Sequence, residues 1–268
     1  MSTPASETFD DVQEDEKDQE GDRSRMSFLE HLDEFRRRLL YSVYALTATC
    51  AVTFYYWEPI YRYLAHYLKA QGGTLMFSQP MAGFMFSLKT SALLGVIIAS
   101  PFIFTQLWLF IAPGLYAKEK RVVVPFVFFS TLLFVAGAYF AHAVGFPAMA
   151  QFFASYGTDD IAYMPQLDVI FSLYVKVVLG MGVAFQLPML VFFLARFGMV
   201  TAGFLLRKFK YAVLISFVVA AIITPTPDVA TQTLLAVPML GLYLLGVLVA
   251  WVFGRPRRRS EEAVSAEA

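Results

Sequence analysis

The sequence predicts an all-α integral membrane protein, and two features of its composition support that prediction. Of its 268 residues, 58% are hydrophobic, 16% are aromatic and only 16% are charged. Soluble domains carry charge at about 25% of their positions, so this chain is too poor in charge for a soluble domain of its length. The apolar residues also gather in long runs, and most of the charges lie between the runs or in the tails. The fold class is therefore a bundle of transmembrane helices.

Six apolar runs meet or approach the length of a membrane span. A helix needs about 20 apolar residues to cross the hydrocarbon core, because each residue adds only ~1.5 Å. We expect six transmembrane helices, at about residues 39–57, 84–111, 122–143, 169–195, 211–223 and 229–253. The fifth run is short and stops at a Thr-Pro-Thr-Pro sequence, where two prolines cannot continue a helix. Spans five and six should therefore form a tight antiparallel hairpin.

The basic residues predict the orientation of the bundle. They gather before the first span, in the loops after the second and fourth spans, and after the sixth. The opposite side holds only Arg62 and Lys69, both in the first loop. Loops rich in lysine and arginine stay in the cytoplasm, so both termini should be cytoplasmic. We expect three regions: a disordered acidic tail at 1–25, a membrane domain at 26–254 and a cytoplasmic tail at 255–268.

Two acids lie close to membrane helices on the predicted cytoplasmic side. Glu34 belongs to the segment SFLEHLDEFRRRLL, which leads into the first span, and Glu119 lies among basic residues in the loop after the second span. An isolated carboxylate of this kind is usually a solvated loop charge. Two of them on one face can instead each take one guanidinium of a basic ligand. Arginine–carboxylate pairs can be bidentate, which gives a geometric specificity that lysine lacks.

A polar group in hydrocarbon is a functional hypothesis by default. Six polar residues lie within the apolar runs or at their ends: Lys89, Gln106, Lys176, Gln186, Asp228 and Gln232. Lys176 lies about two turns inside the fourth span and can face a wet cavity. Gln186 precedes Pro188, which frees a backbone carbonyl near the middle of the membrane. Asp228 can cap the sixth helix by accepting from free backbone N–H groups, and Gln232 follows one turn later.

No catalytic or metal-binding pattern is present in the sequence. The three histidines are dispersed without an HExxH pair, and there is no GxSxG, P-loop or CxxC motif. We therefore expect no enzyme activity, no catalytic residue, no metal and no cofactor. Any energy input must come from a partner or from an ion gradient.

Four segments in order resemble the TatC family, the multispanning receptor subunit of the twin-arginine protein translocase. They are HLDEFRRRLL, QLWLFIAPGLYAKEKRVVVPF, GVAFQLPML and TPTPDVATQTLLAVPM, and the similarity covers about residues 26–254. The resemblance implies a six-span bundle shaped as a concave cup. It also implies that Glu34 and Glu119 receive the twin arginines and that Asp228 and Gln232 contact partners. The other residues implied at the signal-peptide site are Arg36, Phe110, Lys120 and Arg121.

The resemblance also implies a setting and a set of partners. These are TatA and TatB-type single-span subunits, folded preproteins with an Arg-Arg signal peptide, and the proton motive force. The chain would work as an oligomer in the lipid bilayer of the bacterial inner membrane, without nucleic acid. One departure matters: many members carry glutamate where this chain has Gln186. Glutamine cannot titrate near neutral pH, so hydrogen bonding is expected there rather than proton relay.

An ion-coupled small-molecule secondary transporter is the alternative function. Such a protein would use Lys176 and Gln186 beside the helix that Pro188 breaks. Transporters of this kind often contain inverted repeats. No convincing internal repeat is found in this sequence, which weighs against the alternative.

Overall fold

The computed structural model describes residues 7–72, 75–76, 79–111, 120–157, 163–224 and 228–254. Side chains are described from Glu30 onward, apart from residues 72 and 120–123. This part of the chain is helical, and its only β pairing is an isolated bridge between Met76 and Gln166. The helices are α1 (Glu7–Tyr55), α2 (Trp57–Gly72), α3 (Ala82–Ile111), α4 (Lys120–Phe140), a π-helical segment (Ala141–Gly145), α5 (Phe146–Ala154), α6 (Leu167–Ala184), α7 (Leu187–Arg196), α8 (Ala202–Arg207), α9 (Phe209–Ile223) and α10 (Val229–Phe253).

The all-α membrane fold is confirmed, whereas the count of six spans stays a prediction. Among the described residues, four stretches are long and apolar enough to cross a membrane as judged by length and composition: Ala82–Ile111, Val124–Ala154, Leu167–Arg196 and Val229–Phe253. The first predicted span belongs to a pair of helices, Glu30–Tyr55 and Trp57–Gln71, that bend by 80° and count as a fifth if taken together. The fifth predicted span is α9, whose 15 residues reach about 22 Å, short of a ~30 Å core.

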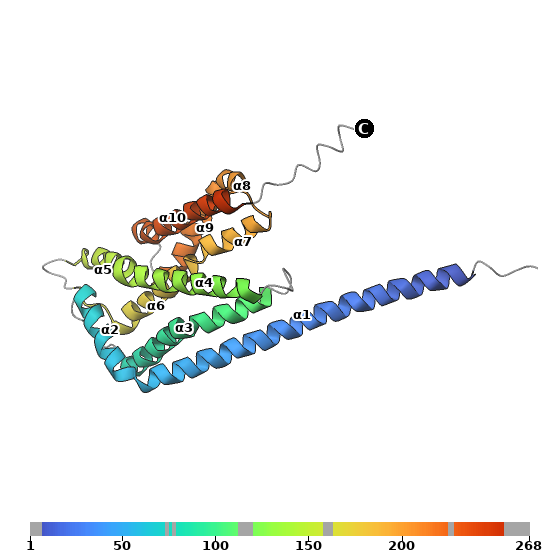
Figure 1. Ribbon diagram of the computed structural model, residues 1–268. Helices are drawn as coiled ribbons and strands as arrows, with labels where there is room; N and C mark the ends of the chain where they lie inside the picture. The colour runs from blue at the N-terminus through green and yellow to red at the C-terminus, as the bar shows by residue number, and fades with distance from the viewer. Residues whose placement is uncertain are drawn as a thin grey trace, which may run out of the picture.

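The N-terminal region continues the first helix. Helix α1 extends back to Glu7 and runs on beyond the bundle as one long rod (Figure 1). The disorder expected over 1–25 stays a prediction. No proline interrupts the chain between Glu7 and Tyr55, so nothing in the backbone forces the helix to stop. A helix that is polar all round has no face to bury, so packing cannot stabilise this part. The limits of the membrane domain stay predictions, and residues 255–268 lie outside the described residues.

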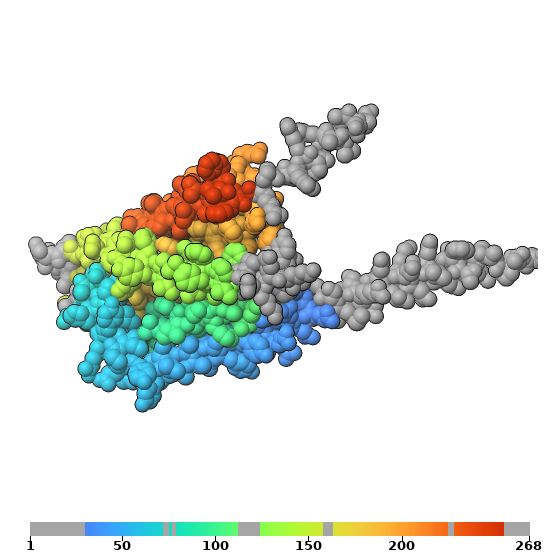
Figure 2. Space-filling model, viewed as in Figure 1, coloured from blue at the N-terminus to red at the C-terminus, as the bar shows by residue number. Residues whose placement is uncertain are grey.

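The helices are stacked from α1 at one edge to α10 at the other (Figures 1 and 2). Helix α1 packs on α3, α3 packs on α4 and α6, and α10 packs on α7 and α9. The main apolar core surrounds α6, where Phe171, Val177 and Met181 are fully buried. A smaller core joins α7, α8 and α10 around Val191 and Leu205. Helix α6 therefore lies at the centre of the main core.

Hydroxyl groups join α1 to α3. The Oγ1 atom of Thr49 donates to the carbonyl of Gly95 at 2.9 Å, and that of Thr53 donates to the carbonyl of Ser91 at 2.8 Å. Thr49 and Thr53 are four residues apart on α1, and Ser91 and Gly95 are four residues apart on α3. Residues at this spacing share one face of a helix, so the bonded residues lie on the facing sides of α1 and α3. Small side chains at such a contact let the two backbones approach closely. The contact therefore combines close packing with satisfied polar groups.

Glycines set the distance between α4 and α6. A Cβ atom added at Gly137 would lie 2.6 Å from the carbonyl oxygen of Met181 and 2.8 Å from Cγ of Phe185. A Cβ added at Gly182 would lie 2.8 Å from the ring of Phe134. Each glycine thus leaves room for the opposite helix. The carbonyl of Met181 belongs to a backbone that cannot turn aside as a flexible side chain can.

We predict that Gly137→Ala lowers the stability of the protein. The added methyl group must push α4 away from α6, and overpacking of this kind costs about 1–3 kcal/mol. Thermal unfolding in detergent, followed by intrinsic fluorescence, measures the change. Gly241→Ala is the matched control, because a Cβ there has no neighbour within 4 Å. Equal melting temperatures for the two variants would contradict the packing described here.

Candidate functional site

An ion pair lies on α1 close to the end of α3. The Nη2 atom of Arg38 lies 2.8 Å from Oε1 of Glu34, and Nε of the same arginine lies 3.3 Å from that oxygen. The two residues are one helical turn apart, and each side chain is only about one-fifth exposed, at 22% for Arg38 and 23% for Glu34. This pairing follows from i,i+4 spacing, which places the two side chains on one face.

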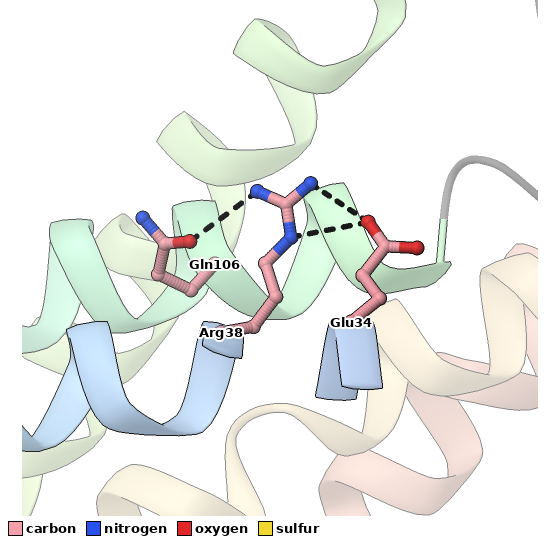
Figure 3. A network of polar contacts seen from close by, with 3 residues as sticks. All are labelled: Glu34, Arg38 and Gln106. Atoms are coloured by element: carbon pink, nitrogen blue, oxygen red, sulfur yellow. Dashed lines mark hydrogen bonds and ion pairs between the residues drawn. The ribbon is translucent and has the colours of Figure 1, made fainter. Parts of the chain in front are cut away.

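A residue from α3 completes the polar network. The Nη1 atom of Arg38 donates to Oε1 of Gln106 at 3.4 Å, so the guanidinium bridges the two helices (Figure 3). Gln106 is itself buried, with 8% of its surface exposed. The guanidinium of Arg38 thus donates to Gln106 on one side and to Glu34 on the other. Both contacts between Arg38 and Glu34 use the Oε1 atom of Glu34. Neither contact uses the Oε2 atom of Glu34.

Aromatic side chains border the network on the side of the helix ends. The ring of Phe110 stacks on that of His31 with centroids 4.5 Å apart, and it lies 5.3 Å from the ring of Phe35. A pocket of about 180 Å³ separates α1 from α3 here, with Phe110, Leu107 and Ile103 on its apolar side and Arg38 and Gln106 on its polar side. The pocket is thus mainly apolar, and Arg38 is the one charged residue in its lining.

The described part of the chain includes some of the residues predicted at the signal-peptide site but not all of them. Glu34 and Phe110 lie beside this pocket, at the same end of the bundle. Arg36 is exposed on another face of α1, because residues two apart in a helix point in different directions. The arginine that contacts Glu34 is Arg38. Glu119 lies outside the described residues. Lys120 and Arg121 open α4, and their side chains are outside the description.

Gln186 lies in the break between α6 and α7, as the position of Pro188 predicts. Its Nε2 donates to the carbonyl of Ser130 in α4 at 2.9 Å, and the hydroxyl of the same serine accepts from Nε1 of Trp108 in α3 at 3.0 Å. Ser130 is 1% exposed. One serine thus ties together three transmembrane segments. This bond lies within the chain, so a hydrogen bond from Gln186 to a partner helix stays a prediction.

Asp228 caps α10, as predicted from its place after the proline turn. Its Oδ1 accepts from the backbone N–H of Thr231 at 2.7 Å, and its Oδ2 accepts from the Thr231 hydroxyl at 2.6 Å. Gln232 is half-buried in the first turn of α10, and its side chain makes no hydrogen bond to another described residue. The two residues are neighbours at the start of the last helix.

Lys176 does not join the other polar groups. It is exposed on α6 and makes no ion pair or hydrogen bond within the described part of the chain. Ten residues separate it from Gln186, which is about 15 Å along a helix axis. Among the described residues no group of three or more His, Cys, Asp or Glu side chains could hold a metal ion. The structure thus brings together Glu34, Arg38, Gln106 and Phe110.

The fold and this site define a multi-pass helical membrane protein with a carboxylate–guanidinium network at one end of its bundle. Comparison with known proteins identifies its family. The sequence model of the family described as TatC, Sec-independent protein translocase protein, matches residues 30–238. The chain therefore belongs to the TatC family.

Individual relatives and a solved structure support the same family assignment. The Sec-independent protein translocase protein TatC of Helicobacter pylori strain 26695 is 43% identical over 220 residues, which are 82% of this chain and 85% of the relative. That of Koribacter versatilis is 39% identical over 249 residues, which are 90% of this chain and 92% of the relative. A crystal structure of the twin arginine translocase receptor TatC superposes with a TM-score of 0.74 at 34% identity, covering 82% of this chain and 97% of that one.

We predict that Gln186→Leu destabilises the protein by about 1 kcal/mol, because the carbonyl of Ser130 loses a donor in a place without water. The loss should lower the thermal midpoint in detergent by about 2–4 °C. Gln232→Leu is the control, since its amide has no partner among the described residues. A Gln186→Leu midpoint equal to that of the wild type would show that the bond to Ser130 contributes nothing to stability.

Proposed function

We propose that this chain is the receptor and core subunit of a twin-arginine protein translocase. It binds the Arg-Arg signal peptides of folded preproteins at the face that carries Glu34. The observation that supports this best is the held carboxylate: Arg38, which itself donates to Gln106, donates to Oε1 of Glu34 and makes no contact with Oε2. A second guanidinium can therefore approach the free side of the carboxylate.

The chemistry of a carboxylate–guanidinium pair explains why the site would prefer arginine to lysine. A guanidinium has a planar fork of donors that fits a fixed carboxylate, whereas a lysine ammonium is a compact point charge. A carboxylate that rotates freely adapts to either cation. Glu34 is only 23% exposed and is clamped by its neighbour on the helix, so it offers one orientation. Arg38 acts as a positioning residue in this proposal, because it acts on the ligand through Glu34.

The remainder of the signal site comes from the connection between α3 and α4. Glu119 is the second acid, and it receives the other arginine of the signal. Phe110 offers its ring beside the pocket, while Arg36, Lys120 and Arg121 set the charge around the two acids. The apolar part of the signal peptide then lies against the bundle, away from the charged end.

The wider assembly follows from the family. The chain spans the bacterial inner membrane six times as a cup-shaped bundle, with both termini in the cytoplasm, and it works as an oligomer. TatA and TatB-type single-span subunits pack near spans five and six, where Asp228 and Gln232 open α10. The proton motive force supplies the energy. Lys176, exposed on α6, faces the surroundings of the bundle and takes no part in the signal site.

A small-molecule transporter is not favoured. That function would need Lys176 and Gln186 to act together beside the broken helix. Gln186 is instead bonded to Ser130 in the neighbouring helix, and Lys176 is exposed about 15 Å away along the axis.

We predict that the purified protein binds an Arg-Arg signal peptide more tightly than a Lys-Lys version of equal charge. Glu34→Gln should weaken Arg-Arg binding about 10- to 100-fold, because a charge-assisted hydrogen bond contributes about 1.5–3 kcal/mol. Fluorescence anisotropy of a labelled peptide measures both effects.

Glu58→Gln is the control for this experiment. Glu58 also forms an ion pair one turn along a helix, with Arg62 at 2.6 Å, but it belongs to α2 and is 59% exposed. Its substitution should leave binding unchanged. If both substitutions weaken binding equally, the effect is a general loss of negative charge. If neither does, Glu34 is an ordinary surface acid and the receptor site lies elsewhere.

A further inference from the structure

The π-helical segment between α4 and α5 leaves one backbone carbonyl without its usual donor. The N–H of Phe146 bonds to the carbonyl of Ala141, one residue farther back than in an α-helix. The carbonyl of His142 thereby loses its α-helical donor. The next candidate donor would be residue 147, but this is a proline without an N–H. The hydroxyl of Tyr67 in α2 donates to the carbonyl of His142 instead.

The side chain of His142 is fixed by three tyrosines. The ring of Tyr67 stacks on the imidazole with centroids 4.1 Å apart. The Nδ1 atom lies 3.0 Å from the hydroxyl of Tyr174 in α6, and Nε2 lies 3.5 Å from the hydroxyl of Tyr63 in α2. Tyr174 is 5% exposed, whereas Tyr63 is 62% exposed. The network thus runs from the buried centre of the bundle to its surface.

The burial of Tyr174 sets the direction of these hydrogen bonds. If Nδ1 carried the proton, the hydroxyl hydrogen of Tyr174 would be buried without an acceptor, which costs free energy. Tyr174 therefore donates to Nδ1, and Nε2 carries the proton and donates toward Tyr63. The hydroxyl hydrogen of Tyr63 then remains for an acceptor outside this network. The network ends in a donor at the surface.

An apolar slot lies directly beside that donor. It has a volume of about 270 Å³ and is walled by aliphatic side chains of four helices, among them Leu64, Leu93, Ala138 and Val178. Tyr63, His142 and Tyr174 form its polar end. Tyr139 borders its open side and is 69% exposed. The slot is lined from α2, α3, α4 and α6. It therefore lies at the end of the bundle where α2 packs on α3; Figure 1 shows this arrangement of the helices.

We propose that this slot holds one acyl chain of a membrane phospholipid, and that an ester or phosphate oxygen of the same lipid accepts the hydrogen bond from Tyr63. The walls suit hydrocarbon, and the surface donor suits an acceptor-rich headgroup. One turn of a helix, about 10 Å wide with its side chains and about 5.4 Å long, occupies about 400 Å³, which is more than this slot holds. Pockets for drug-sized ligands also begin at about 300 Å³, so a single chain is the better match.

A photoreactive side chain tests the occupant in native membranes. We would place p-benzoylphenylalanine at Tyr139 of the full chain, irradiate the membranes and measure the mass of the adducts. A phospholipid adduct is the expected result. An adduct with another protein, including a second copy of this chain, would overturn the proposal.

Native mass spectrometry with added phosphatidylethanolamine tests the two contacts separately. Leu93→Trp fills the slot and should abolish binding of the tightest lipid. Tyr63→Phe removes the surface donor together with the long contact to Nε2 of His142, at an exposed position where folding is not at risk, and should weaken that binding about five-fold. Leu248→Trp, at an exposed site on α10, is the control and should bind as the wild type does.

Unchanged affinity in Tyr63→Phe would overturn the proposed hydrogen bond. Undiminished lipid retention in a folded Leu93→Trp protein would overturn the slot itself. Should Leu93→Trp fail to fold, Ala138→Leu fills the same slot from α4 and decides the question. None of these measurements involves a signal peptide, so their outcome does not depend on the receptor function.

Discussion

The structure depends on one constraint: inside hydrocarbon, every backbone polar group must find its partner within the protein. Where Pro147 and the π-helical turn free a carbonyl, Tyr67 supplies the donor. Where Pro188 breaks the helix, Gln186 reaches the carbonyl of Ser130. Threonine hydroxyls of α1 close on carbonyls of α3 in the same way. The irregularities at Pro147 and Pro188 are thus also places where two helices are bonded to each other.

The same constraint shapes the charged end of the bundle. Helix α1 packs on α3, and their hydroxyl bonds in the centre give way to the ion pair of Glu34 and Arg38 at the end. A buried glutamine in α3 holds the guanidinium, and the guanidinium holds the carboxylate. The carboxylate is therefore rigid before any ligand arrives. Rigidity of this kind lets a site distinguish cations of equal charge by shape, which is the property that a receptor for paired arginines requires.

Some of this was readable from the sequence, and some required the fold. Local patterns in the sequence predicted the apolar runs, the break at Pro188 and the cap at Asp228, because each of these features depends only on residues that are neighbours in the chain. The pairing of Glu34 with Arg38 was also local, since their i,i+4 spacing predicts it, although the family resemblance points to Arg36 as a site residue and not to Arg38. Gln106 lies 68 residues from Arg38, so only the packing of α1 on α3 could place it. The same holds for Ser130 and for the tyrosines around His142. The 80° bend after α1 is marked by Pro59 in the first turn of α2, because this proline lacks the N–H that would bond to the carbonyl of Tyr55.

The most direct test of the receptor account is a double-mutant cycle between Glu34 and the signal peptide. Binding free energies would be measured for wild-type and Glu34→Gln protein, each with the Arg-Arg peptide and with peptides in which one arginine is replaced by glutamine. Direct contact predicts a coupling energy of about 1.5–3 kcal/mol with one of the two arginines, because the contact is a charge-assisted hydrogen bond. If the two changes are additive for both arginines, Glu34 does not touch the signal and the account of this site is wrong.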